Sequence, residues 1–259
     1  MDIIGVLHLL PLPGSPRGTS LDNVLARALH DANILVQGGI RKAIVENFGD
    51  APFYKDQVPP HVIAMMTYLI QNIQQECSLE LGVNVLRNDA MSALAIAATT
   101  GCSFIRVNVL SGAAWTDQGY IEGKAIDVLL YRERLKKDIS IMADIKVKHA
   151  IPAGTSDIVQ LAKELIYRAG ADQIIITGEE TGKPCDIEDV QNVYRSFDEH
   201  EKPHIYLGSG VTPDNIMQYQ QWCSGCIVGT YFHKNAKISE PLDLQKVQYF
   251  MERMQPKHF

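Results

Sequence analysis

Tyr206-Leu-Gly-Ser-Gly-Val-Thr-Pro-Asp-Asn-Ile216 and Cys226-Ile-Val-Gly-Thr-Tyr-Phe232 are two apolar segments that each end in a glycine-containing turn. Backbone N–H groups bind phosphate well, and glycine allows the backbone to approach the anion because it has no Cβ. In (β/α)8 barrels, such a phosphate site is built after strands 7 and 8, at the C-terminal face. The two segments lie in the last fifth of the chain, where those strands belong. We therefore predict that the phosphate contacts are Gly208, Ser209, Gly210, Gly229 and Thr230.

The rest of the chain alternates apolar, strand-like segments with amphipathic, helix-like segments, and no linker interrupts them. This alternation is typical of a parallel sheet, and its eightfold repetition in a chain of this length indicates a closed barrel. We predict one domain over residues 1–259, an α/β fold that is a single (β/α)8 TIM barrel. Strands are expected at 3–8, 42–47, 79–85, 104–109, 139–148, 172–177, 204–208 and 226–229. Helices are expected at 20–37, 59–76, 89–100, 124–137, 156–169, 186–198, 212–220 and 241–254.

Composition and charge narrow the class of protein. The chain has 259 residues and a formal net charge of −6, so a nucleic acid is not expected as a partner. No apolar run reaches the roughly 18 residues of a membrane-spanning helix, and the first strand begins too early for a signal peptide. The five cysteines are an odd number scattered along the chain, as expected in a reducing compartment. We predict a cytoplasmic protein.

The fifth predicted strand, residues 139–148, alternates polar and apolar side chains. One parity is apolar and suits contact with the outer helices. The other parity directs Asp144, Lys146 and Lys148 into the barrel. Buried polar groups in a barrel strand need partners or a function, so this strand is the first candidate for the active site.

The third and fourth predicted strands repeat the pattern. Asn84 in the third strand, and Arg106 and Asn108 in the fourth, face inward by parity. Neighbouring parallel strands end at the same edge of the barrel, where TIM-barrel active sites lie. We therefore expect these polar side chains to converge in one cavity at the C-terminal face.

Two interpretations of these polar residues remain open. In the first, Asp144 and Lys146 form one buried ion pair in the barrel interior. In the second, the residues form a catalytic cup with Asp144 as the base and Lys148 as the acid or electrophile. The catalytic candidates are Asp144, Lys148, Lys146, Glu46, Arg106 and Asn108.

Residues at other strand ends are candidates for contact with the substrate. These are Asn84, His8, His149 and Thr177. Each histidine is equally well interpreted as an ordinary core or rim residue. We expect no cofactor, but Glu46, Asp144 and His149 leave a divalent metal ion open as an alternative.

Four blocks of the sequence resemble the BtpA/SgcQ family. They are Gly82-Val-Asn-Val-Leu-Arg-Asn-Asp-Ala90, Phe104-Ile-Arg-Val-Asn-Val109, Asp117-Gln-Gly-Tyr-Ile-Glu-Gly123 and Ala143-Asp-Ile-Lys-Val-Lys-His-Ala150. The resemblance extends over essentially the whole chain. It implies a ribulose-phosphate-binding type barrel related to phosphoribosylanthranilate isomerases, but it implies no particular reaction. The family is also associated with photosystem I accumulation at the thylakoid and with sugar utilisation.

These observations lead to two functional hypotheses. The first is an enzyme that acts on a phosphorylated sugar or phosphoribosyl-type metabolite, as an isomerase, an epimerase or an aldol-type lyase. The second is a noncatalytic barrel that serves as an assembly or stability factor for a membrane complex, as in photosystem I biogenesis. Peripheral membrane association and homo-oligomerisation both stay open. The glycine-containing segment 110–123 is an expected lid over the site, or else an ordinary surface loop.

Overall fold

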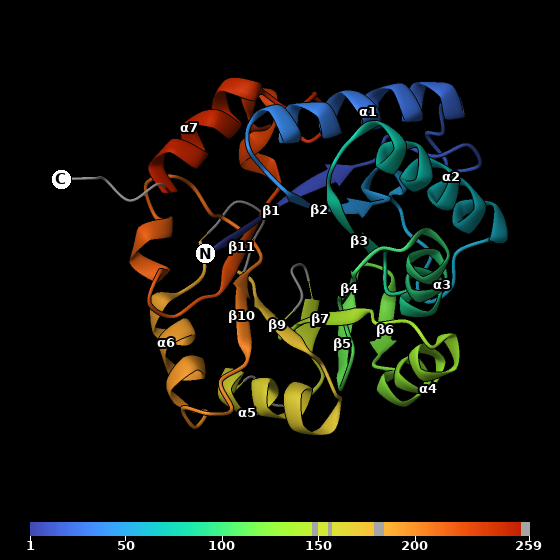
Figure 1. Ribbon diagram of the computed structural model, residues 1–259. Coiled ribbons are helices and arrows are strands. Elements are labelled where there is room, and N and C mark those ends of the chain that lie inside the picture. The colour runs from blue at the N-terminus through green and yellow to red at the C-terminus, as the bar shows by residue number, and fades with distance from the viewer. Residues whose placement is uncertain (147–149, 155–156, 179–183, 255–259) are drawn as a thin grey trace.

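The computed structural model describes residues 1–146, 150–154, 157–178 and 184–254. Within these ranges, eight parallel strands close into a barrel in the order β1-β11-β10-β9-β7-β4-β3-β2 (Figure 1). The predicted fold class is therefore confirmed. The barrel strands are β1 (Asp2–His8), β2 (Lys42–Glu46), β3 (Glu80–Asn84), β4 (Phe104–Val107), β7 (Ser140–Asp144), β9 (Gln173–Ile176), β10 (His204–Leu207) and β11 (Gly225–Val228).

Helices surround the barrel on its outside (Figure 1). Several begin at a residue whose side chain accepts a backbone N–H of the first turn, as Ser20, Asp89, Asp157 and Asp186 do. Among the helices of the described ranges, none has both the length and the apolar character that a membrane crossing requires. The α-helices are α1 (Leu21–Gln37), α2 (Pro60–Glu76), α3 (Ala90–Thr100), α4 (Ala125–Leu135), α5 (Ile158–Lys163), α6 (Ile187–Arg195) and α7 (Leu244–Met254).

The helix predicted over residues 212–220 is wrong. This segment forms a turn followed by a short 3-10 helix, Ile216–Tyr219. The side chain of Asn215 explains the difference, because it accepts the N–H of Thr212 at 2.9 Å and donates to the carbonyl of Gly210 at 2.7 Å. Such local side-chain hydrogen bonds stabilise a turn instead of a helix. The α-helix N-terminus expected beside the predicted phosphate site is therefore not formed by this segment.

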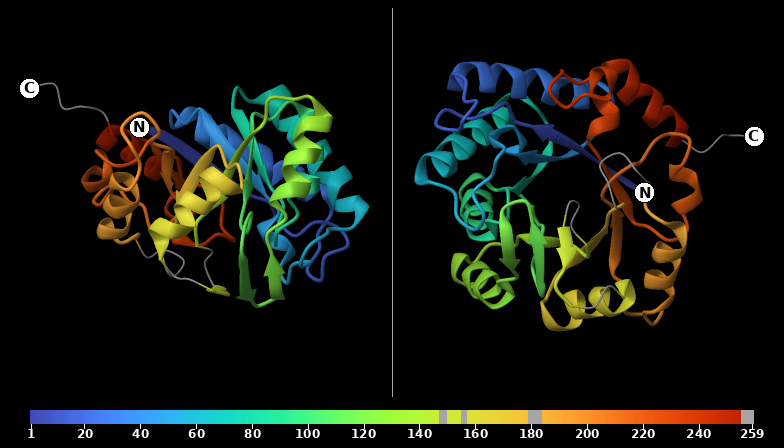
Figure 2. Two further views of the ribbon diagram at one scale, coloured as in Figure 1. Left: turned by 90° about the horizontal axis from the view of Figure 1, so that it is seen from below. Right: turned by 180° about the vertical axis from the view of Figure 1, so that it is seen from behind.

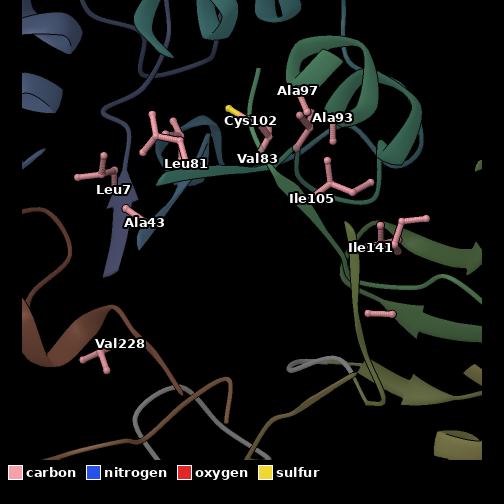
Figure 3. Close-up of a cluster of buried hydrophobic side chains, with 14 of the residues drawn as sticks. Leu7, Ala43, Leu81, Val83, Ala93, Ala97, Cys102, Ile105, Ile141 and Val228 are labelled. Atoms are coloured by element: carbon pink, nitrogen blue, oxygen red, sulfur yellow. The ribbon is translucent and has the colours of Figure 1, made fainter. Parts of the chain in front are cut away.

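Side-chain parity sorts the barrel strands into two apolar layers. Outward residues such as Leu81, Val83, Ile105 and Ile141 pack against the helices, where α3 contributes Ala93 and Ala97 (Figure 3). The barrel interior is filled by Ile4, Val6, Ile44, Phe104, Met142, Ile175, Tyr206 and Ile227. Gly82 makes room for this filling, since a Cβ built there would lie 2.2 Å from the Phe104 ring. The parity predicted for β3, β4 and β7 is confirmed.

The fifth predicted strand ends earlier than expected. It leaves the barrel after Asp144, and residues Ala150–Pro152 form β8 in a separate antiparallel sheet with β5 (Ala113–Thr116) and β6 (Gly119–Glu122). This hairpin sheet, of order β6-β5-β8, includes the segment expected to be a lid. Its strands β5 and β6 extend beyond the barrel in the left view of Figure 2.

Candidate functional site

A cavity of about 350 Å³ opens where the barrel strands end. It contains several predicted site residues from different strands, which the fold brings together from distant parts of the sequence. The site residues that line it are His8, Glu46, Arg106, Asn108, Asp144, Gly208, Ser209, Gly210, Gly229 and Thr230. Their convergence agrees with the expected position at the C-terminal face.

Arg106 and Asp144 form a bidentate ion pair at the base of this cavity. Arg106 Nε donates to Asp144 Oδ2 at 2.9 Å, and Nη2 donates to Oδ1 at 3.0 Å. The side chains are 11% and 1% exposed. Burial lowers the pKa of Arg106, but the charge and hydrogen bonds of Asp144, with Glu46, outweigh burial and raise it overall. Arg106 is therefore a permanent cation that Asp144 holds in place.

Asp144 accepts further hydrogen bonds from its neighbours. Thr177 Oγ1 donates to Oδ1 at 2.9 Å, and Asn108 Nδ2 approaches Oδ2 at 3.5 Å. The first interpretation, an ion pair of Asp144 with Lys146, is therefore wrong, because Asp144 is paired with Arg106 instead. A carboxylate that accepts this many bonds is well suited to orient its partners.

Asn84 lies behind Asn108, one layer away from the cavity. Its Nδ2 donates to Asn108 Oδ1 at 3.1 Å and to the carbonyl of Arg106 at 2.9 Å. Its Oδ1 is buried and has no hydrogen-bond partner among the described residues. Asn84 therefore fixes the orientation of the Asn108 amide. Asn108, and not Asn84, lines the main cavity.

The two glycine turns border the cavity together, as the sequence predicted, but the amides contribute differently. The N–H of Gly208 already donates to the carbonyl of Ile176 at 2.7 Å, and the role of Gly208 as a phosphate contact stays a prediction. Ser209 Oγ accepts the N–H of Gly178 at 2.9 Å, and Gly210 adopts a φ of 64°. The roles of Ser209, Gly210, Gly229 and Thr230 as phosphate contacts stay predictions.

Lys146 is placed less favourably than the predicted residues that line the main cavity. Lys146 lies just beyond the end of β7, after Ile145, and lines an adjoining cavity of about 310 Å³ under the hairpin sheet, together with Asn108 and Asp144. It lies outside the main cavity because the chain has left the strand, where parity no longer directs side chains inward. Lys148 and His149 lie outside the described residues.

Sequence reasoning missed Arg87, which follows β3 and lines the main cavity. Burial lowers the pKa of its guanidinium, and the carboxylates of Asp117, Asp144 and Glu46 oppose that effect. Asp117 comes from the tip of the hairpin and also lines the cavity. The sequence feature that could have identified Arg87 is its position in the same family-like block, Gly82–Ala90, as the candidate Asn84.

Sequence reasoning also missed His233, which is fully buried behind His8. The His8 Nδ1 and His233 Nε2 atoms are 3.0 Å apart. Phe48 also packs edge-on against the His8 ring, with ring centroids 5.2 Å apart. His233 follows the second glycine turn by only four residues, but nothing in the sequence indicates that it contacts His8.

The described part of the chain contains no cluster of three or more His, Cys, Asp or Glu side chains arranged to hold a metal ion. Glu46 and Asp144, two members of the alternative metal site, both line the main cavity. The third member, His149, is not among the described residues. Arg106, Thr177 and Asn108 each donate a hydrogen bond to Asp144. These contacts stabilise its carboxylate without a metal ion.

Comparison with known proteins identifies relatives over the whole barrel. The model of the BtpA family matches residues 1–256. The photosystem I biogenesis protein BtpA of Synechocystis is 44% identical over 97% of this chain and 87% of its own length. An uncharacterized protein of Pyrococcus furiosus is 41% identical over 95% of this chain and 92% of its own.

A solved structure extends the comparison to the fold. The phosphoribosyl anthranilate isomerase of Thermus thermophilus superposes with a TM-score of 0.60 over 98% of each chain. The sequences are only 7% identical, so this likeness concerns the fold alone.

Proposed function

Because the chain belongs to the BtpA family, whose model matches it almost from end to end, we propose that it is an enzyme acting on a phosphorylated sugar or phosphoribosyl-type metabolite. The reaction class that we propose is isomerisation, epimerisation or aldol-type cleavage. Each of these reactions removes a proton, either from a carbon next to a carbonyl group or from a hydroxyl group, and develops negative charge on oxygen. The cavity offers cations for that charge and backbone turns for the phosphate.

One observation carries this proposal. Arg106 and Arg87 line the same cavity of about 350 Å³ as the two glycine turns, so two cationic side chains share one cavity with the candidate phosphate site. A sugar phosphate has an anionic end and a polar, reacting end, and it requires both kinds of contact. A mostly apolar cavity in which a few charged and polar side chains converge favours an enzyme over a barrel that only binds other proteins.

The hydrogen bonds suggest how the roles are divided. Arg106 is oriented by both oxygens of Asp144, so we assign Arg106 to the stabilisation of the developing oxyanion. Asp144 acts through Arg106 in this assignment, because its oxygens already accept bonds from Arg106 and Thr177. Lys148 stays the proposed acid or electrophile from the sequence.

Two measurements test the proposal. The protein is purified in phosphate-free buffer, and small molecules released by denaturation are identified by mass spectrometry. We expect a phosphorylated sugar metabolite. Inorganic phosphate is then titrated into ¹⁵N-labelled protein, and we expect the amide signals of Gly210, Gly229 and Thr230 to shift. A phosphate-free extract together with unshifted signals at these three residues would contradict the proposed substrate class.

A specific observation also supports the alternative, an assembly factor for a membrane complex. The 44% identical relative from Synechocystis is named for photosystem I biogenesis. In addition, the hairpin sheet exposes Trp115 and Ile151, which are paired across β5 and β8 and are 57% and 71% exposed. Contiguous exposed apolar surface is typical of protein or membrane contacts.

The two functions can be separated in one host. This chain is expressed in Synechocystis that lacks its own BtpA, and photosystem I is quantified. If assembly depends on the hairpin surface, Trp115→Ser lowers photosystem I while Arg87→Gln preserves it. If the role in the cell depends on the enzyme, we expect the reverse pattern.

A further inference from the structure

The histidine pair at the cavity wall is asymmetric, and the asymmetry begins at Glu240. The His233 Nδ1 and the backbone oxygen of Glu240 are 2.6 Å apart. A carbonyl oxygen only accepts hydrogen bonds, so His233 Nδ1 must carry a proton. The tautomer of His233 is thereby fixed by its surroundings.

The loop that presents this carbonyl is held on several sides. Arg27 from α1 donates to the carbonyl of Glu240, and Asp31 accepts the N–H of Leu242 at 3.0 Å. Lys246 from α7 donates to the carbonyl of His233 at 2.8 Å. The Glu240 carbonyl, which accepts the hydrogen bond from His233 Nδ1, therefore lies in a segment that these hydrogen bonds hold in place.

The charge of His233 follows from its burial. Its side chain is 0% exposed, and this burial lowers its pKa despite the hydrogen bond to Glu240 and the charge of Asp31, while Arg27 and Lys246 lower it further. His233 is thus neutral near pH 7, and its Nε2 has a lone pair. A hydrogen bond between His233 Nε2 and His8 Nδ1 then requires the proton to be on His8 Nδ1.

The remaining nitrogen of His8 is the one nearest the second glycine turn. His8 is the last residue of β1 and lines the cavity. A Cβ built on Gly229 would lie 3.3 Å from His8 Nε2, so the backbone of the turn and this nitrogen are close neighbours. With the proton on Nδ1, a neutral His8 has its basic lone pair on Nε2.

We propose that His8 is the proton acceptor of the reaction and that His233 is its positioning residue, which fixes the proton on Nδ1 and the lone pair on Nε2. The proposal rests on the proposed function, because it assigns the missing base. In the proton-transfer step, a substrate C–H or O–H bond breaks, its electron pair stays on the substrate, and the proton goes to His8 Nε2. The resulting imidazolium keeps its Nδ1–H bond to His233 and later returns the Nε2 proton.

Several titratable groups surround the two rings. Glu46 is paired in register with His8 on the neighbouring strand β2. Asp31 and Arg27 on α1, and Lys246 on α7, influence His233. Because these groups also titrate, the His233 variants and the wild type are first compared at a single pH, before pH profiles are interpreted.

The tautomer is tested on the intact, ligand-free protein by ¹⁵N–¹H correlation spectra of labelled histidine rings. We expect neutral His8 in the Nδ1–H form, although free histidine prefers Nε2–H. Two variants sharpen the test. Glutamine at position 233 offers an acceptor where Nε2 was, so His233→Gln should retain the Nδ1–H form of His8. Asparagine offers only the donor to Glu240, so His233→Asn should release His8 to a mixture of tautomers.

His204→Gln is the matched control, because His204 is exposed and contacts Ser224 instead. It should leave the His8 signals unchanged. A wild-type His8 in the Nε2–H form would overturn the assignment, and this measurement requires no variant to fold. The same result from His233→Gln and His233→Asn, with both variants folded, would also count against the positioning role.

Turnover tests the second half of the proposal, with the metabolite that co-purifies as substrate. We expect His8→Gln to lower kcat by about 100-fold or more, with a smaller change in KM, as loss of a general base does. The acid limb of the pH profile should disappear. An unchanged kcat would refute His8 as the base. If no metabolite is retained and phosphate does not bind, the proposed function fails, but the tautomer measurement still decides the role of His233.

Discussion

Arg106 on β4 and Asp144 on β7 are joined by two parallel hydrogen bonds of 2.9 and 3.0 Å across neighbouring strands. Both side chains are mostly buried, so neither charge is well solvated without the other. Such a pair adds little stability compared with apolar residues, but removal of one partner leaves an uncompensated buried charge. In the proposed function, we therefore assign the pair the role of orienting the Arg106 guanidinium in the cavity.

Replacement of one partner should destabilise the barrel strongly. We expect Arg106→Met to lower the free energy of unfolding by about 3–5 kcal/mol, because Asp144 becomes a buried charge without its counterion. Urea denaturation measures this change. The double variant Arg106→Met/Asp144→Leu should recover a large part of the loss. As a control, Lys124→Met, which breaks the more exposed pair with Asp56, should cost at most about 1 kcal/mol.

The backbone of the second glycine turn should tolerate no side chain. A Cβ at Gly229 would lie 2.8 Å from His8 Cε1, so Gly229→Ala should displace His8 and weaken phosphate binding at least tenfold. Gly225 is a matched control at the other end of the same strand, where a Cβ would lie 2.5 Å from the Asp2 carbonyl. Gly225→Ala should lower stability and leave phosphate affinity in the folded protein nearly unchanged. Calorimetric titration with inorganic phosphate distinguishes the two effects.

Arg87 should contribute to the affinity for an anionic substrate. A charge-assisted hydrogen bond is worth about 1.5–3 kcal/mol, so Arg87→Gln should weaken substrate binding by roughly ten- to a hundredfold. The control is Arg195→Gln, since Arg195 lies over the Trp222 ring outside the cavity. Dissociation constants for the co-purifying metabolite provide the measurement. Equal affinity of the Arg87 and Arg195 variants would exclude Arg87 from substrate binding.

The buried neutral His233 should make stability depend on pH. Burial lowers its folded-state pKa below its ordinary value near 6.5, so the unfolded chain binds the extra proton first. Stability is then fully present above about pH 6.5 and is lost as the pH falls toward the folded-state pKa, with a slope of up to about 1.4 kcal/mol per pH unit. His233→Gln should flatten this slope between pH 7.5 and 5.5 in urea titrations. His204→Gln, a change at an exposed histidine, should leave the slope as it is in the wild type.

Much of the site could be predicted from the sequence because strand parity is a local property. Alternation placed Asp144, Arg106 and Asn108 on the inner face, and the glycine turns marked where the last two strands end. Prediction failed where the chain left regular structure. Lys146 lies beyond the end of β7, so the direction of its side chain depends on the hairpin sheet, in which Ala150–Pro152 pair with β5. The helix expected at 212–220 was lost to the side-chain hydrogen bonds of Asn215.

The sequence by itself determined the barrel, its apolar layers and the family, because hydrophobic periodicity and motif blocks are properties of residues that are close together in the sequence. Only the tertiary structure decided which partner each buried polar group has. It paired Asp144 with Arg106 instead of Lys146, and it set His233 behind His8, 225 residues away in the chain. The physical reason is that hydrogen bonds and charges act over a few ångströms in space, so their partners depend on how the barrel closes and not on sequence spacing.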